Sequence, residues 1–212
     1  MIGDVLYIKD EHRECASELF KMIERLRDSQ RFVVAISGES GSGKSVLSHC
    51  LATEYKNIGK RAKILHTDNY YKILPELRND WRQEHGANSI GYEEYDWDIL
   101  NSNIAAFRKG TQTEMPCVDL LTDQVDSLTT DFSTIEILIL DGLYAIKCDD
   151  VDLRIFIDIT YHETKKAQII RGKEKLTPLR EMILQKEHEM VSALRDCADV
   201  LVDTTWKIAN CP

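Results

Sequence analysis

The chain has 212 residues, of which 43% are hydrophobic, so it can bury one good core and disorder is not expected. Its net charge of −9 argues against a broad basic surface, and we expect neither a nucleic-acid nor a membrane partner. Six cysteines without a CxxC pair, and the lack of a signal peptide or of an apolar run of about 20 residues, point to reduced thiols in a cytoplasmic protein.

The first predicted element is a helix over residues 11–28. Apolar side chains recur there at helical spacing with charges between them, and they define its buried face: Cys15, Leu19, Met22, Ile23 and Leu26. We interpret residues 1–30 as an N-terminal helical extension and residues 31–212 as the main domain. Packing is the role we expect for this helix.

A phosphate-binding loop follows a short strand. Residues 31–37 are an apolar run of the kind expected for a buried parallel strand, and residues 45–55 have a helical composition and spacing. Between them, the sequence GESGSGKS at residues 38–45 fits GxxxxGK[ST] at every fixed position. This motif predicts a nucleoside triphosphate site formed by Gly38, Glu39, Ser40, Gly41, Ser42, Gly43, Lys44, Ser45 and Val46.

Each residue type in this loop has a physical role. Glycine permits φ values that side chains forbid, so successive N–H groups can turn toward the phosphates at the positive end of the next helix. We expect Lys44 to reach the β- and γ-phosphates and the Ser45 hydroxyl to bind Mg²⁺. A glycine-rich turn that matches by chance is the competing interpretation, which the flanking strand and helix disfavour.

Strand and helix patterns alternate along the rest of the chain. We expect four further strands, at residues 62–67, 135–140, 153–159 and 200–202. Helical patterns include residues 97–109, ended by Gly110, and residues 178–195, which begin with proline. The alternation predicts an α/β protein with the three-layer α/β/α fold of P-loop NTPases, a five-stranded, mainly parallel sheet and a small lid.

Two strand ends carry carboxylates suited to phosphoryl transfer. The apolar run 135–140 leads into Asp141, which would place a Mg²⁺ ligand opposite Ser45. The strand 62–67 leads into Asp68, which would orient an acceptor hydroxyl near the γ-phosphate and take its proton. An ordinary turn and a helix cap are the competing interpretations of these aspartates.

A long connection, residues 69–134, leaves the carboxyl end of the second strand and is rich in aromatic and charged residues. In open α/β sheets, ligands bind beyond the carboxyl ends of the strands, and long irregular connections are usually functional. We therefore expect this insertion to bind the small-molecule acceptor.

Several segments occur in a set order along roughly residues 31–204: the phosphate loop, TDNYYK at 67–72, YDWD at 95–98, LILDG at 138–142 and CADVLV at 197–202. Together they resemble the phosphoribulokinase and uridine kinase family of P-loop kinases. The resemblance implies ATP as the phosphate donor, Asp68 as the catalytic base and Asp141 as a residue that helps to hold Mg²⁺.

The same resemblance implies a basic lid that closes over the phosphates, at about residues 163–178. Arg171 is its only arginine, and a guanidinium on the transferred group stabilises the developing charge, so we expect Arg171 to be a lid catalyst. A solvated basic helix face is the alternative. Family members line the acceptor pocket at the positions of Tyr71 and Asp119, which we therefore predict to bind substrate.

Other acceptor contacts depart from the uridine kinase pattern. Where nucleoside-specific members carry an aspartate, a tyrosine, a histidine and an arginine, this chain has Ile90, Val118, Asp123 and Val125. A site built around hydrogen bonds discriminates strongly between substrates, so these changes leave the acceptor open. It could be uridine or cytidine, or another alcohol such as pantothenate, glycerate or a sugar phosphate.

The sequence thus predicts a Mg²⁺-dependent kinase that transfers the γ-phosphate of ATP to a hydroxyl of a small metabolite. A GTPase is disfavoured because NKxD and DxxG are absent, and a motor ATPase because Gly142, rather than glutamate, follows Asp141. A catalytically idle regulatory protein derived from a kinase stays open, because acceptor contacts are missing and the lid is short. The sequence is compatible with a homo-oligomer and does not fix the oligomeric state.

Overall fold

The computed structural model describes residues 5–164 and 177–210, which are organised around one six-stranded sheet. The helices are α1 (Asp10–Leu26), α2 (Lys44–Asn57), α3 (Pro75–His85), α4 (Trp97–Lys109) and α6 (Pro178–Ser192). The strands are β1 (Phe32–Gly38), β2 (Ala62–His66), β3 (Gln112–Asp119), β4 (Gln124–Asp131), β5 (Ile137–Asp141), β6 (Leu153–Ile157), β7 (Val200–Val202) and β8 (Ile208–Asn210). None of the helices in these described ranges has the length and apolar character needed to span a membrane.

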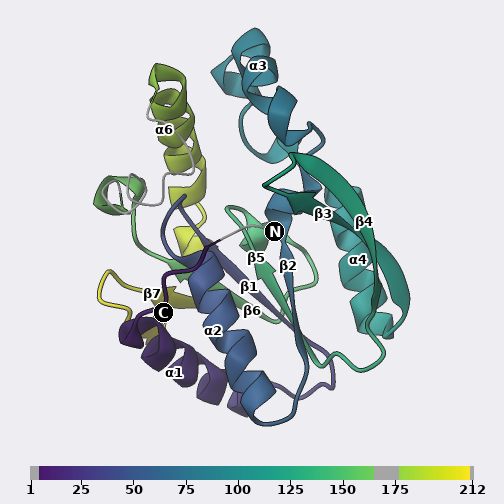
Figure 1. Ribbon diagram of the computed structural model, residues 1–212. Coiled ribbons are helices and arrows are strands. Elements are labelled where there is room, and N and C mark those ends of the chain that lie inside the picture. The colour runs from purple at the N-terminus through teal and green to yellow at the C-terminus, as the bar shows by residue number, and fades with distance from the viewer. Residues whose placement is uncertain (1–4, 165–176, 211–212) are drawn as a thin grey trace.

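The sheet has the strand order β2-β5-β1-β6-β7-β8 (Figure 1). Neighbouring strands from β2 to β7 pair in parallel, and β8 pairs antiparallel with β7. The predicted α/β fold with a mainly parallel sheet is confirmed. The five predicted strands are the parallel ones. Strand β8 was not predicted because two of its three residues, Ala209 and Asn210, are of types that are depleted in strands, whereas β7 is wholly apolar.

The register of the sheet brings two strand ends together. Strand β5 covers residues 137–141 rather than the predicted 135–140, so Asp141 is its last residue. In the pairing of β5 with β2, Asp141 lies opposite His66, and in the pairing with β1 it lies opposite Ile36. The carboxyl ends of three neighbouring strands therefore meet at one edge of the sheet.

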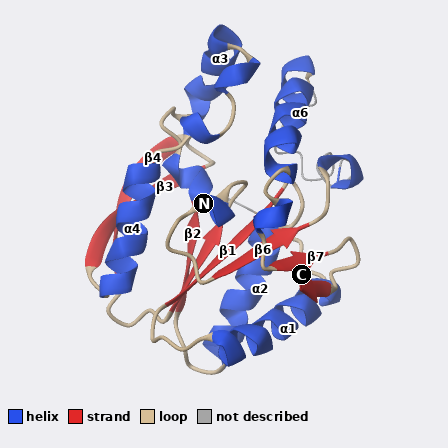
Figure 2. Ribbon diagram, turned by 180° about the vertical axis from the view of Figure 1, so that it is seen from behind, coloured by secondary structure: helices blue, strands red, loops and turns tan. Residues whose placement is uncertain are grey.

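Helices cover both faces of the sheet, as Figure 2 shows from behind. On one face, α1 and α2 pack on the strands in a core that includes Leu19, Leu51 and Ile139. On the other face, α4 and the end of α6 pack on the sheet in a second core that includes Leu100 and Val191. These two cores give the three predicted layers.

Helix α1 contributes to the first of these cores. Cys15, Ala16, Leu19 and Ile23 are each at most 1% exposed, and α1 packs along α2. Leu26, which the sequence pattern places on the buried face, is 55% exposed because it is the last residue of the helix. Residues 10–26 therefore share a core with the phosphate-binding part of the chain.

The insertion over residues 69–134 is more regular than the sequence suggested. Besides the predicted helix at 97–109, it contains α3 and an antiparallel hairpin of β3 and β4. Helix α3 buries only Arg82, so it has no apolar stripe to predict it, and nearly every residue of β4 is exposed, so the strand shows no alternation. Figure 1 shows α3 and α6 projecting beyond the same end of the sheet.

Candidate active site

The phosphate loop joins β1 to α2. Gly38 has a φ of +151°, and a Cβ there would lie 2.8 Å from the carbonyl oxygen of Ile157, so a larger residue does not fit. Gly43, the N-cap of α2, has a φ of 96°. The Ser42 N–H donates to the carbonyl oxygen of Glu39 over 3.1 Å and closes the loop. The loop thus lies at a helix N-terminus, where backbone N–H groups can cradle phosphates.

Lys44 opens α2 and lies among several carboxylates. Its Nζ donates to the carbonyl oxygen of Glu39 over 2.9 Å. Burial lowers the pKa of the Lys44 ammonium, and nearby negative charges act in the opposite direction, those of Asp141, Asp68, Glu187 and Glu39. The structure therefore brings the predicted phosphate-binding lysine together with both predicted carboxylates.

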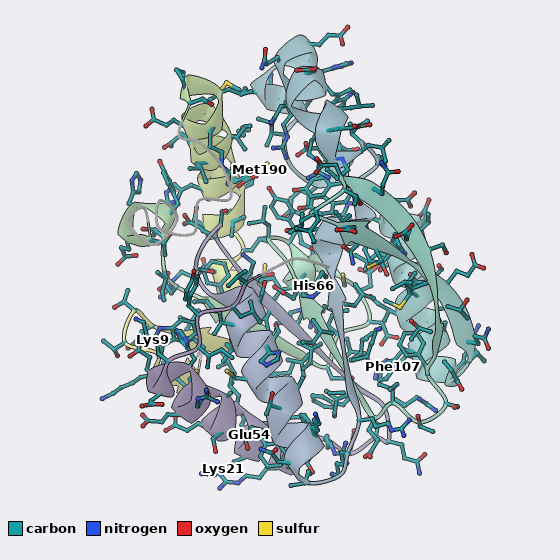
Figure 3. The ribbon with its side chains drawn as sticks, viewed as in Figure 1. Lys9, Lys21, Glu54, His66, Phe107 and Met190 are labelled. Atoms are coloured by element: carbon teal, nitrogen blue, oxygen red, sulfur yellow. The ribbon has the colours of Figure 1, made fainter. Side chains whose placement is uncertain are left out.

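Asp141 is 3% exposed at the end of β5. Its Oδ2 lies 2.8 Å from Nδ1 of His66, which Figure 3 labels near the middle of the molecule. The Ser45 side chain also acts on this carboxylate. Burial by itself would raise the pKa of Asp141. The hydrogen bond and charge of His66, the charge of Lys44 and the side chain of Ser45 outweigh burial and hold that pKa below its usual value.

Asp68 lies in the short 3₁₀ helix Thr67–Tyr70, directly after β2. Its Oδ1 is buried and has no hydrogen-bond partner among the described residues. The charge of Asp68 acts on Lys44 on the nucleotide side and on Tyr71 on the side of the insertion. Because a buried polar oxygen without a partner is costly, this oxygen marks a place where a ligand hydroxyl can donate.

Gly142 makes a close contact with the segment that carries Asp68. A Cβ on Gly142 would lie 1.6 Å from Oγ1 of Thr67, the residue before Asp68. Any larger side chain would push the ends of β2 and β5 apart. The glutamate that motor ATPases carry at this position therefore does not fit, which gives the sequence-based argument a steric reason.

Tyr71 lies between Asp68 and α3. Its hydroxyl oxygen accepts a hydrogen bond from the Tyr95 hydroxyl over 2.6 Å. The guanidinium carbon of Arg78 lies 3.6 Å from the centroid of the Tyr71 ring, and that of Arg82 lies 5.9 Å from it. Burial raises the pKa of Tyr71, and the charge of Asp68 raises it further. The predicted substrate-binding tyrosine is thus beside the predicted base.

A buried ion pair joins α3 to the segment before α4. Arg82 donates from Nε to Oε1 of Glu94 over 2.6 Å and from Nη2 to Oε2 over 3.0 Å. Glu94 also accepts the N–H of Gly91 over 2.9 Å. Nη2 of Arg82 lies 4.0 Å from Oε1 of Glu187 on α6. The insertion over residues 69–134 is therefore connected by charge to the helix that follows the predicted lid.

The side chain of Glu39 connects the phosphate loop to both flanks of that lid. Its Oε2 accepts the N–H of Tyr161 over 2.7 Å, and its Oε1 lies 2.7 Å from Nδ1 of His188. Glu39 is 4% exposed. Its carboxylate is thus turned toward the lid flanks, and it is the backbone of Glu39 that remains for a nucleotide.

Ser40, the next loop residue, is also held from both flanks. Thr164 donates from Oγ1 to the carbonyl oxygen of Ser40 over 3.3 Å, and Arg180 donates from Nη2 to its Oγ over 3.2 Å. Arg180 lies in the first turn of α6 and thus reaches the phosphate loop. The predicted lid catalyst Arg171 lies outside the described residues, as does most of the predicted lid over 163–178.

Two predicted site residues use their side chains elsewhere. Val46 is 5% exposed and packs in the core between α1, α2 and the sheet, so only its backbone can face a nucleotide. Asp119 ends β3, and its Oδ1 accepts the N–H of Leu121 over 2.8 Å in the hairpin turn. In the parts of the chain that the structure describes, Asp119 makes no hydrogen bond or ion pair with Asp68 or Tyr71.

The positions that depart from the uridine kinase pattern lie in two environments. Ile90 and Val118 are each 3% exposed and belong to the packed interior of the insertion. Asp123 lies in the hairpin turn with a φ of 55°, and Val125 is 39% exposed at the start of β4. The differences from the uridine kinase pattern therefore affect both the interior and the hairpin tip of the insertion.

Sequence reasoning left three residues of this site unassigned: His66, Arg180 and Glu187. The strand that carries His66, predicted over residues 62–67, and the helix that carries Arg180 and Glu187 were predicted. Only the strand order places His66 opposite Asp141, and only the packing of α6 turns the other two toward the phosphate loop and Lys44. The signal available in the sequence was the position of His66 near the end of a predicted strand, two residues before Asp68.

The comparison with protein families agrees with this geometry. A family model described as "Phosphoribulokinase / Uridine kinase family" matches residues 33–177, which is more than half of the chain. The chain belongs to this family. As a phosphoribulokinase/uridine kinase family member, it is a P-loop kinase of an ATP-using family, and the predicted family resemblance is confirmed.

Proteins that are similar to this chain in sequence or in fold carry the names of different kinases. The bifunctional alpha-galactosidase/sucrose kinase AgaSK of Mediterraneibacter gnavus is 28% identical over 207 residues, which cover 88% of this chain and 22% of that protein. A uridine kinase of Ureaplasma urealyticum is 24% identical over 185 residues, which cover 84% of this chain and 85% of the enzyme. The fold of D-glycerate 3-kinase from Cryptococcus neoformans matches with a TM-score of 0.63 at 13% identity, covering 96% of this chain and all (100%) of that one.

Proposed function

We propose that this family member transfers the γ-phosphate of ATP to a hydroxyl of a small metabolite, with Mg²⁺ as cofactor. The observation that carries the proposal is Oδ1 of Asp68, which is buried without a hydrogen-bond partner among the described residues. The same carboxylate interacts with Lys44 on one side and Tyr71 on the other. A base for phosphoryl transfer to an alcohol must lie between donor and acceptor in this way.

On the donor side, backbone N–H groups of the phosphate loop bind the phosphates and Lys44 pairs with the β- and γ-phosphates. Nζ of Lys44 donates to the carbonyl oxygen of Glu39, and the charged phosphate oxygens of ATP would be a stronger acceptor for this ammonium. Arg180, which contacts Ser40 of the loop, adds a guanidinium near the transferred phosphoryl group.

The residues present fit a Mg²⁺ ion. The Ser45 side chain lies close enough to the Asp141 carboxylate to lower its pKa, so a hydroxyl and a carboxylate lie near each other beside the loop. No group of three or more His, Cys, Asp or Glu side chains able to hold a metal occurs within the described residues. Mg²⁺ is usually bound through one or two protein oxygens, substrate phosphates and water, so two ligands suffice. When bound, the ion would neutralise charge on the phosphates.

On the acceptor side, Asp68 orients the hydroxyl and takes its proton as the new oxygen–phosphorus bond forms. Relatives are named for uridine, sucrose and D-glycerate, which are all alcohols of different shape and charge. The substituted nucleoside contacts, Ile90 and Val118 among them, disfavour a nucleoside and leave other small alcohols as acceptors.

The test is ATP-to-ADP turnover with Mg²⁺ against uridine, cytidine, sucrose, pantothenate, glycerate and sugar phosphates, with an acceptor-free control. We expect one acceptor class to stimulate turnover, and Asp68→Asn to remove that stimulation while ATP still binds. A regulatory protein that only binds nucleotide would give the same ATP affinity with no acceptor-dependent product in any reaction. That outcome would replace the kinase proposal with the regulatory one.

A further inference from the structure

Helix α3 carries two arginines one turn apart, and they differ in how their charge is neutralised. Arg82 pairs with Glu94 through two hydrogen bonds and lies 4.0 Å from Glu187. Arg78 forms no ion pair with a carboxylate in residues 5–164 and 177–210, where its hydrogen bond runs from Nη2 to the carbonyl oxygen of Ile73 over 3.3 Å. Of these two cations, Arg78 is therefore the one left for a ligand.

Tyr71 fixes the position of the Arg78 guanidinium. The guanidinium carbon lies 3.6 Å from the centroid of the Tyr71 ring, which is a close cation–π contact. Nε of Arg78 is buried and has no hydrogen-bond partner among the described residues. A guanidinium offers planar, paired donors that match a carboxylate or a phosphate, and a buried donor without a partner is costly. The arrangement is that of a preformed anion-binding residue.

Arg78 lies on the acceptor side of the transfer site. Asp68 and Tyr71 lie in and directly after the same short 3₁₀ helix, and the Tyr71 ring contacts Arg78. The charge of Asp68 also acts on Lys44. Since Lys44 faces the phosphates of ATP, Arg78 is at the other end of this series of four residues. An alcohol whose hydroxyl meets Asp68 would extend along Tyr71 toward the Arg78 guanidinium.

Two carboxylates on this side of the site, those of Glu94 and Glu187, already have Arg82 as a cationic neighbour. Glu94 is bound by Arg82 and by a backbone N–H, and Glu187 lies next to Arg82. The chain as a whole carries a net charge of −9, so its overall field repels an anionic metabolite. A local cation at the acceptor end would offset that repulsion.

We infer that the acceptor is an anionic alcohol, whose carboxylate or phosphate group is bound by Arg78 while its hydroxyl meets Asp68. This inference rests on the proposed function and narrows its acceptor. Neutral alcohols, such as nucleosides and unphosphorylated sugars, would leave Arg78 without a counter-charge.

Calorimetric binding in the presence of Mg²⁺ and a non-hydrolysable ATP analogue tests this inference. The ligands are glycerol, glycerate and glycerol 3-phosphate as one matched set, and fructose with fructose 6-phosphate as another. We expect an anionic member to bind roughly 10- to 100-fold more tightly than its neutral counterpart, the range for hydrogen bonds to a charged group. The affinity for glycerate, compared with the affinities for glycerol 3-phosphate and fructose 6-phosphate, shows whether the site prefers a carboxylate or a phosphate group.

Variants at Arg78 test whether this residue causes the preference for anionic ligands over neutral ones. Arg78→Gln should lose the preference for anions, and Arg78→Lys should keep part of it, because lysine retains the charge but not the paired donors. Arg61→Gln is the matched control, since it removes the same charge from an exposed residue at the opposite end of β2. Thermal unfolding of each variant shows that it is folded.

The outcomes separate the inference from the function on which it rests. If no anionic member binds better than its neutral counterpart, or if Arg78→Gln keeps the preference, the inference is overturned. Transfer to a neutral acceptor that is unaffected by Arg78→Gln would also overturn it and leave the kinase function intact. Anion binding through Arg78 without any transfer that depends on Asp68 would support the site and overturn the kinase function.

Discussion

The nucleotide side and the acceptor side of this site are built in different ways. The nucleotide side rests on β1, β5 and the start of α2. Every residue of these two strands is buried, and we propose that backbone N–H groups of the loop do most of the nucleotide binding. The acceptor side rests on an insertion with an exposed hairpin and a polar helix, held by aromatic contacts and the Arg82–Glu94 pair. A backbone site in a buried sheet tolerates little change, whereas a side-chain site on an insertion can be altered residue by residue.

If the two sides differ in this way, the largest loss of activity is expected from a substitution on the nucleotide side, at Lys44. Lys44→Ala removes the charge that faces the β- and γ-phosphates, so we expect turnover to fall by ~10³ and the ATP-induced rise in Tm to disappear. Lys56→Ala, on the exposed side of the same helix, should leave both unchanged. An ATP-induced shift in Lys44→Ala equal to that of the wild type would contradict the assignment of the loop.

The next effect is expected at Asp68, where the two sides meet. Asp68→Asn keeps the shape of the side chain but cannot take the proton of the acceptor, so transfer should slow by ~10² to 10⁴ while ATP affinity stays nearly constant. Single-turnover kinetics together with ATP binding measure the two quantities separately. Equal rates in the variant and the wild type would remove Asp68 from the mechanism.

A smaller effect is expected at Arg180, which contacts the loop from α6. Arg180→Lys keeps the charge but loses the planar fork, and we expect kcat to fall by roughly 10-fold or more with a lesser change in ATP affinity. Lys186→Gln on the same helix, where the lysine forms an exposed pair with Glu189, serves as the control. Full kcat in Arg180→Lys would show that its fork does not contact the phosphoryl group.

The smallest effect is expected at Gly142, and it is one of packing. Gly142→Ala places a Cβ against Thr67, and such overpacking costs about 1–3 kcal/mol, or roughly 2–4 °C of Tm for each kcal/mol. Since Asp68 follows Thr67, we expect some loss of transfer as well. In a double-mutant cycle, Thr67→Ala should recover part of the lost Tm, and additive losses would show that the two residues do not interact.

The sequence predicted the nucleotide side better than the acceptor side, for a physical reason. A phosphate loop needs fixed residues at fixed spacing, so residues 38–45 could be recognised in isolation, and buried strands such as β5 appear as apolar runs. The hairpin and α3 carry neither signal, because β4 is almost wholly exposed and α3 buries one arginine. Their place in the fold depends on contacts such as the one between Arg78 and Tyr71.

Contacts between neighbouring strand ends, and contacts made by α6, could not be predicted from the sequence either. The contact of His66 with Asp141 requires the strand order, which places β2 next to β5 rather than next to β1. The contact of Glu39 with His188 joins residues 149 positions apart in the sequence. Long-range pairing of this kind follows from the packed structure, and no local pattern specifies it.

The burial of α1 has a consequence for how this chain can be divided. Its side chains at Cys15, Leu19 and Ile23 cover an apolar surface of α2, the helix that begins at the phosphate loop. A chain shortened to begin at residue 31 would keep every recognisable kinase motif and yet expose that surface to water, at a cost of about 25 cal/mol for each Å² uncovered. We therefore expect a fragment that begins at residue 31 to be less stable than one that includes the first helix.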